Sequence, residues 1–167
     1  MPSLSPAEKA KVLEILIGRR FELREEAEQI AQELISVVDS PAIADDVESD
    51  LLALTVEDLS GRAGRQRHGY VHPADAAQEL LEEAIEPYLT ELRRLIKLGL
   101  KEQAVASAVG VIAGLYRCRD AAEGEFLLAW APDFPWEMAH AIREELRIAG
   151  IVVALQRMDE VAPDWAE

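Results

Sequence analysis

Apolar side chains recur every three or four residues along most of this chain. Glutamate and glutamine fill the positions between them over residues 22–38, and similar stripes follow over 43–54, 77–96 and 138–149. This spacing predicts amphipathic helices that each turn one side to a core. The stripes comprise Leu23, Ala27, Ile30, Leu34 and Val38; Ile43, Val47, Leu51 and Leu54; Ala77, Leu80, Leu81, Ala84, Tyr88, Leu92, Leu95 and Ile96; and Met138, Ala139, Ile142, Leu146 and Ala149.

A further helix is predicted at the start of the chain. Ser5 precedes Pro6 and lies three residues before Glu8, a pattern typical of an N-cap with proline in the first helical turn. We expect this helix to run to about Ile17, where Gly18 ends or kinks it.

Similar signals mark later boundaries. Ser40-Pro41 starts another helix, and Thr55–Asp58 is expected to cap one or two further turns before Gly61. Pro87 lies inside the stripe over 77–96, so we expect a kink or a break near Glu86.

The segment from Leu100 to Tyr116 is apolar or small at nearly every position, which predicts a helix buried on most sides. Ala106, Gly110 and Gly114 fall four residues apart on one stripe of it. Because these residues lack bulk, we expect a neighbouring helix to approach closely there. The uncharged run over 104–116 is shorter than the roughly 18–20 residues of a membrane helix, so packing is favoured over a membrane dimer motif.

Together these patterns predict an all-α protein of six to eight helices, packed as helical hairpins in a bundle or a short irregular helical-repeat array. A short helix is expected over 125–131, and a final helix is favoured over a strand for 151–155. No β-hairpin is predicted. The chain is expected to form a single domain, 1–167, with possible sub-lobes 1–60 and 73–155 joined by a loop over 61–72.

The net charge of the chain limits the classes of partner that it can be expected to bind. Seventeen Lys and Arg stand against thirty-two Asp and Glu, a formal net charge of -15. Phosphate repulsion argues against a nucleic-acid partner, and the lack of a long apolar run argues against a membrane. One cysteine excludes a disulfide framework, and the first residues show no secretory signal. We therefore expect a cytoplasmic protein.

The predicted loop over 61–72 holds three arginines between two acidic stretches: Arg62, Arg65 and Arg67. One interpretation, the favoured one, is that they form structural ion pairs with the flanking helices, Arg65 being the most engaged and Arg62 less so. The other is that the loop presents them to an anion or to a carboxylate of a partner, which the planar guanidinium suits.

Candidate chemistry is sparse. His68, Tyr70 and His72 alternate in the same loop, and one hypothesis gives them an enzymatic site, with His140 and Glu144 as a further pair one helical turn apart. Structural roles are favoured for all three histidines, because no zinc or di-iron pattern is complete. No metal, cofactor or catalytic residue is predicted.

Two further features have alternative interpretations. Cys118 lies between two arginines, which would favour a thiolate if it were exposed, but its place at the end of an apolar helix favours a buried thiol. Trp130, Phe134 and Trp136 cluster around two prolines. We favour a staple that fixes one helix end on a neighbour over an exposed docking anchor.

A resemblance to known proteins rests on Asp58-Leu59, Gly61–Arg65, Gly69–Val71 and Pro73, Leu98–Leu100, Gly114–Arg117 and Trp130–Pro135. These stretches resemble a segment of uncharacterised bacterial and archaeal helical proteins, some of which accompany SWIM-type zinc fingers. The resemblance covers roughly residues 50–150. The cysteine and histidine ligands of such a finger are absent here, so the resemblance implies a helical-repeat-like interaction region and no zinc, DNA or catalytic role.

The leading functional hypothesis is a non-enzymatic helical module that binds a protein partner. The alternatives are a small-molecule or metal-dependent enzyme that uses the loop histidines, and an acidic mimic that occupies a basic surface of another protein. The predicted binding residues are Arg62, Arg65, Arg67, His68 and Tyr70.

Overall fold

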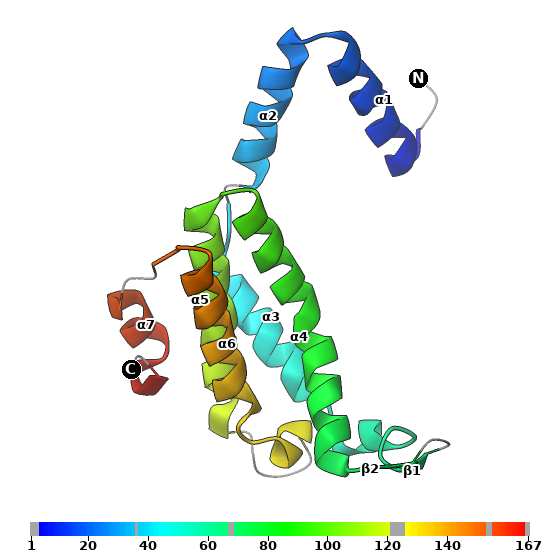
Figure 1. The fold of residues 1–167 in the computed structure, drawn as a ribbon, viewed down its shortest axis with the longest axis vertical. Coiled ribbons are helices and arrows are strands. Elements are labelled where there is room, and N and C mark those ends of the chain that lie inside the picture. Colours follow the sequence, from blue (N-terminus) through cyan, green and yellow to red (C-terminus); the bar gives the residue numbers. More distant parts are fainter. Residues whose placement is uncertain (1–3, 36, 67–68, 121–125, 153–154, 166–167) are drawn as a thin grey trace. The chain divides into compact units, whose positions relative to one another are not determined.

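The structure is a computed structural model that describes residues 4–35, 37–66, 69–120, 126–152 and 155–165 (Figure 1). The predicted all-α class is confirmed: α-helices and short 3-10 helices make up nearly all of the regular structure in these ranges. The chain divides into two compact units, Met1–Val37 and Val38–Glu167. None of the described helices is both long and apolar enough to cross a membrane.

The first unit is a pair of helices, α1 (Pro6–Arg19) and α2 (Glu22–Ile35). The predicted N-cap is confirmed: the Glu8 backbone N–H donates to Ser5 Oγ, and the Ser5 N–H donates to Glu8 Oε2 at 2.8 Å. This reciprocal arrangement satisfies two amide groups that the first helical turn leaves without partners. Gly18 does not end the helix, which continues to Arg19.

The second unit is built around α5 (Lys101–Arg117), which is buried along most of its length. Packed against it are α3 (Ser40–Ala53), α4 (Pro73–Lys97), α6 (Phe134–Ile148) and the short α7 (Leu155–Val161) (Figure 1). Part of each predicted stripe is buried: Val47 and Leu51 of α3; Ala77, Leu81, Leu92 and Leu95 of α4; and Ala139, Ile142 and Leu146 of α6. On α4 the prediction was wrong in the middle of the helix, where Ile85 and Leu89 are buried and the predicted Ala84 and Tyr88 are only half-buried. The spacing of apolar residues therefore predicts the helices of this core but not every residue that they bury.

The small residues of α5 let α3 approach closely, as predicted. A Cβ added to Gly110 would lie 2.7 Å from the Ser40 carbonyl oxygen, and one added to Gly114 would lie 2.7 Å from the Ala44 carbonyl oxygen. The Ser40 hydroxyl also donates to the Ala106 carbonyl at 2.7 Å. Helix α3 therefore packs directly against the stripe of Ala106, Gly110 and Gly114 on α5.

The predicted break near Glu86 does not occur, because α4 continues through Pro87 (Figure 1). Pro87 lies on the exposed side of the helix, where water can solvate the carbonyl that its missing N–H leaves without a donor. On the opposite side the buried Leu81, Ile85 and Leu89 run past the proline in one stripe. Burial of this stripe holds both halves of α4 in one helix.

The absence of a β-hairpin was a wrong prediction. Within the predicted loop, β1 (Gly64–Gln66) pairs antiparallel with β2 (Gly69–Val71). Strands of three residues are too short for a two-residue period to be recognised in the sequence. Before β1 in the chain, the predicted capped turn is confirmed as the 3-10 helix η1 (Val56–Leu59).

The remaining described segments of the second unit include several short helices. The 3-10 helix η2 (Cys118–Asp120) follows α5, and η3 (Leu127–Trp130) corresponds to the predicted short helix. The helix expected over 151–155 is absent at residues 151 and 152, and α7 starts at Leu155; residues 153 and 154 lie outside the described residues. The last 3-10 helix, η4 (Pro163–Trp165), docks on α5, where the Trp165 ring meets Tyr116 edge to face at 5.0 Å.

Candidate functional site

The described members of the predicted binding residues, Arg62, Arg65 and Tyr70, lie on and beside the β1–β2 hairpin, next to the first turn of α4 (Figure 1). Arg62 lies in the turn after η1, Arg65 in β1 and Tyr70 in β2. Arg67 and His68 lie outside the described residues. We call Arg62 together with the described residues of the two strands the arginine hairpin.

Glycine conformations shape the arginine hairpin. Gly61, Gly64 and Gly69 all adopt positive φ angles, of 85°, 86° and 146°. Side chains other than hydrogen are disfavoured in that region, so these positions require glycine. The register then places Gly64 opposite Val71 and Arg65 opposite Tyr70. The glycine spacing was the available sequence signal for this hairpin.

Arg65 and Tyr70 form an exposed cross-strand pair. Residues directly opposite each other in an antiparallel ladder project to the same face. Tyr70 is 71% exposed and Arg65 is also exposed. Within the described ranges, Arg65 forms no ion pair with an acidic residue. A guanidinium and a phenol are therefore presented side by side to solvent.

Arg62, in contrast, forms an ion pair with an acidic residue of α4. Its two terminal nitrogens donate to the two carboxylate oxygens of Glu83 on α4, at 2.6 and 3.0 Å. This hydrogen bonding raises the pKa of Arg62 and lowers the pKa of Glu83. The expectation that Arg65 is the most engaged arginine is therefore wrong, because Arg62 forms an ion pair with α4 and the exposed Arg65 forms none among the described residues.

The pair between Arg62 and Glu83 is exposed, with 44% and 59% of the two side chains accessible. Solvent weakens such pairs and ordering both side chains opposes them. We expect Arg62→Ala to lower the melting temperature by no more than about 3 °C, and Arg65→Ala to leave it unchanged. Thermal unfolding followed by circular dichroism checks both variants. A larger loss for Arg65→Ala than for Arg62→Ala would contradict this assignment.

The histidines outside the arginine hairpin have structural contacts. His72 is the N-cap of α4, and its Nδ1 accepts from the Ala74 N–H at 3.3 Å. His140 stacks on Trp136 with ring centroids 5.7 Å apart. A nitrogen that accepts a capping hydrogen bond is not available as a metal ligand or base in that arrangement.

Of the pair of His140 and Glu144, the carboxylate is bound by an arginine. Glu144 accepts two hydrogen bonds from Arg147, at 2.6 and 2.7 Å, and this hydrogen bonding lowers the pKa of Glu144. In the described part of the chain, no three His, Cys, Asp or Glu side chains come together as metal ligands would. The favoured structural interpretation of these side chains fits this geometry.

Cys118 is buried, with 1% of its surface exposed. Burial raises the pKa of its thiol to about 12, and the nearby Arg117 offsets this only in part. The thiol is therefore protonated at neutral pH. Of the two interpretations of Cys118, the buried thiol is confirmed.

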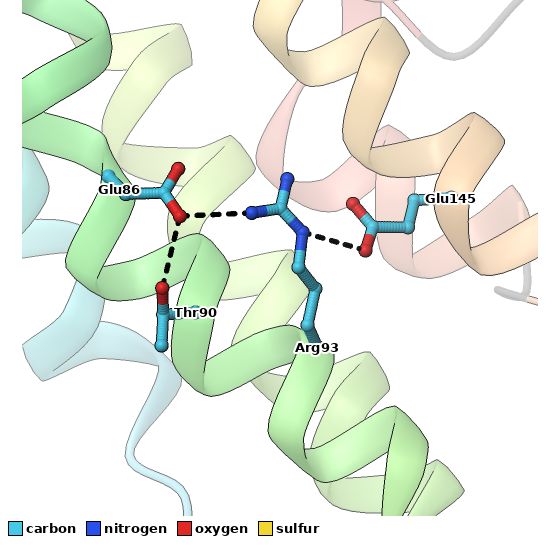
Figure 2. A network of polar contacts seen from close by, with 4 residues as sticks. All are labelled: Glu86, Thr90, Arg93 and Glu145. Atoms are coloured by element: carbon cyan, nitrogen blue, oxygen red, sulfur yellow. Dashed lines mark hydrogen bonds and ion pairs between the residues drawn. The ribbon is translucent and has the colours of Figure 1, made fainter.

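Two arginines that the sequence analysis did not single out join separate helices. Arg93 on α4 lies between Glu86 of the same helix and Glu145 of α6, at 3.1 Å from each, and Thr90 donates to the same Glu86 oxygen (Figure 2). Figure 2 shows the guanidinium spanning the gap between the two helices. Such long-range pairs have no signal in a single sequence.

Arg117 makes the second connection, from the end of α5 to α3. Its guanidinium contacts Asp45 at 2.6 Å and Glu48 at 3.3 Å. These hydrogen bonds raise the pKa of Arg117. Asp45 and Glu48, which precede the arginine hairpin in the chain, are thus paired by an arginine that follows it, after α4 and at the end of α5. Among the ion pairs found in the described residues, the arginine hairpin contributes only the one that Arg62 makes.

Comparison with known proteins adds no assignment to this site. No family model, no curated protein and no solved structure matches the chain. The resemblance to the helical region that accompanies SWIM-type zinc fingers stays a prediction.

Proposed function

We propose that this chain is a helical protein-interaction module that contacts its partner through the arginine hairpin. The observation that carries the proposal is the exposed pair of Arg65 and Tyr70, held opposite each other on a short, glycine-shaped hairpin. The helices of the second unit serve as the scaffold. The implied SWIM-associated resemblance, which includes residues of this hairpin, points to the same class of function.

The chemistry of the pair suits a protein surface. Arginine and tyrosine are the residue types that contribute most to binding energy at protein interfaces, together with tryptophan. The guanidinium of Arg65 can bind a carboxylate through two hydrogen bonds, while the ring of Tyr70 offers a rigid apolar face with a polar tip. The expected partner surface combines an acidic side chain with an adjacent apolar contact.

An enzymatic function has less support. Among the described residues, His72 is used as a helix cap, since its Nδ1 accepts from the Ala74 N–H. The described side chains of the arginine hairpin do not converge on one another as a nucleophile and its base would. A protein-binding role needs only the exposed side chains that are present.

The proposal is tested by comparing capture of cellular proteins by three immobilised forms of the full chain. We expect the wild type and Trp136→Ala to retain the same partner, and the double variant Arg65→Ala/Tyr70→Ala to lose it. Trp136 is a matched control because it is also an exposed aromatic side chain, but lies on α6 and not on the hairpin. Retention of every captured protein by the double variant would overturn the proposal.

A second candidate, the acidic mimic, is favoured by one feature of α4. Glu79, Glu82, Glu83 and Glu86 line one shallow groove of about 440 Å³. A basic partner would bind this row in a salt-sensitive manner. Capture that is lost in the double variant Glu79→Gln/Glu82→Gln, and kept in Arg65→Ala/Tyr70→Ala, would assign the binding to this row instead.

A further inference from the structure

The first unit exposes an unusual amount of apolar surface. Among residues 4–31 no side chain is buried. Large apolar side chains on both helices and in the turn between them are at least 43% exposed: Val12, Leu13, Ile15, Leu16, Phe21 and Ile30. Helices of fourteen residues gain most of their stability from packing an apolar face. This pair therefore presents a face that a further helix pair can cover.

The two helices carry opposite charge. With three basic and two acidic side chains, α1 has a net charge of +1. With one basic and five acidic side chains, α2 has a net charge of -4. A partner that offers both an acidic and a basic amphipathic helix complements this surface. A second copy of the chain has that combination.

The charges flank the apolar positions. On α1, Lys9 and Arg19 share the three- and four-residue spacing of Val12 and Leu16, so basic groups lie at both ends of the apolar stripe. On α2, Glu22 and Glu26 precede Ile30 at four-residue intervals. Charged side chains beside an apolar contact favour a partner of opposite charge and disfavour one of like charge.

We propose that two copies of this chain associate through their first units, with α1 of each copy beside α2 of the other in a four-helix bundle. In a two-fold interface each α1–α2 contact occurs twice, so both new contacts join opposite charges. The other pairing would place α2 against α2, two helices of net charge -4 each. Like-charge repulsion disfavours that arrangement. This surface is separate from the arginine hairpin, so neither proposal depends on the other.

Sedimentation equilibrium of the full chain over a range of concentrations tests the association. We expect a mass of about twice the 18.5 kDa of one chain. Leu16→Glu should weaken the dimer by at least about 100-fold, because it places a charge in the apolar contact. Ile148→Glu, at an exposed position of α6, should leave it unchanged. A monomer at every concentration up to about 100 µM, or a dimer that Leu16→Glu does not weaken, would overturn the proposal.

A charge exchange tests the pairing of the helices without relying on one destabilising variant. Lys9→Glu/Arg19→Glu makes α1 acidic, and Glu22→Lys/Glu26→Lys reduces the negative charge of α2. Each double variant alone should be largely monomeric. An equimolar mixture should restore the dimer, because the exchanged α1 of one copy then meets the exchanged α2 of the other. Failure of the mixture to associate would reject the α1–α2 pairing.

Discussion

Replacing Gly114 with leucine is expected to lower the free energy of unfolding of the second unit by about 3 kcal/mol or more. Even a single Cβ at this position would lie 2.7 Å from the Ala44 carbonyl oxygen and 2.7 Å from Val47 Cβ. The nearest obstacles include backbone, so α3 as a whole must move away from α5 to admit a side chain. Chemical denaturation followed by circular dichroism measures the loss.

Gly18 provides the matched control. It is also a helical glycine, but a Cβ added there would meet nothing within 4 Å. Gly18→Ala should be neutral or slightly stabilising, by up to about 1 kcal/mol, because alanine restricts the unfolded chain more than glycine does. If Gly114→Leu unfolded at the same denaturant concentration as the wild type, α3 could not lie on the glycine stripe of α5.

Phe134→Ala is expected to cost about 3–5 kcal/mol of stability, whereas Trp136→Ala should cost less than about 1 kcal/mol. Phe134 is 2% exposed at the start of α6, and its removal leaves a cavity that the surrounding core fills only in part. Trp136, two residues later, is 52% exposed and contacts His140. Urea denaturation of the two variants separates these roles.

Equal losses for Phe134→Ala and Trp136→Ala would show that the whole aromatic cluster acts as the staple. In the structure the two interpretations of the cluster divide between its members. Phe134 is the buried anchor, and Trp130 and Trp136 remain 42% and 52% exposed. The sequence favoured a staple, and one of the three aromatic side chains forms it.

Helix positions were predictable because burial repeats with the period of the helix. The glycine stripe was predictable for a related reason: Ala106, Gly110 and Gly114 are small at successive turns, and only a close neighbour requires that. The continuity of α4 through Pro87 was not predictable from local preferences, because the buried stripe on its other side decides it. Tertiary burial here outweighs a local penalty of a few kcal/mol.

The candidate site was predictable in location but not in detail. Arginines between two acidic stretches indicated ion pairing, and Arg62 does pair with Glu83. The choice between Arg62 and Arg65 depends on which way each side chain projects, and that is set by a hairpin whose strands are three residues long. Contacts such as Arg93 with Glu145, separated by 52 residues, leave no local pattern to read.

The packing of α3 against the small residues of α5 has a consequence for how the chain folds. The Ser40 hydroxyl and the Ala106 carbonyl that meet there are 66 residues apart, whereas α4 and α5 are joined by the three residues 98–100. Loop-closure entropy rises with chain length, so α4 and α5 can pair at lower entropic cost before α3 arrives. Substitutions at Gly114 then act on a late contact, and we expect them to accelerate unfolding more than they slow folding. The close contact between α3 and α5 is in this sense expected to form late in folding and to be lost early in unfolding.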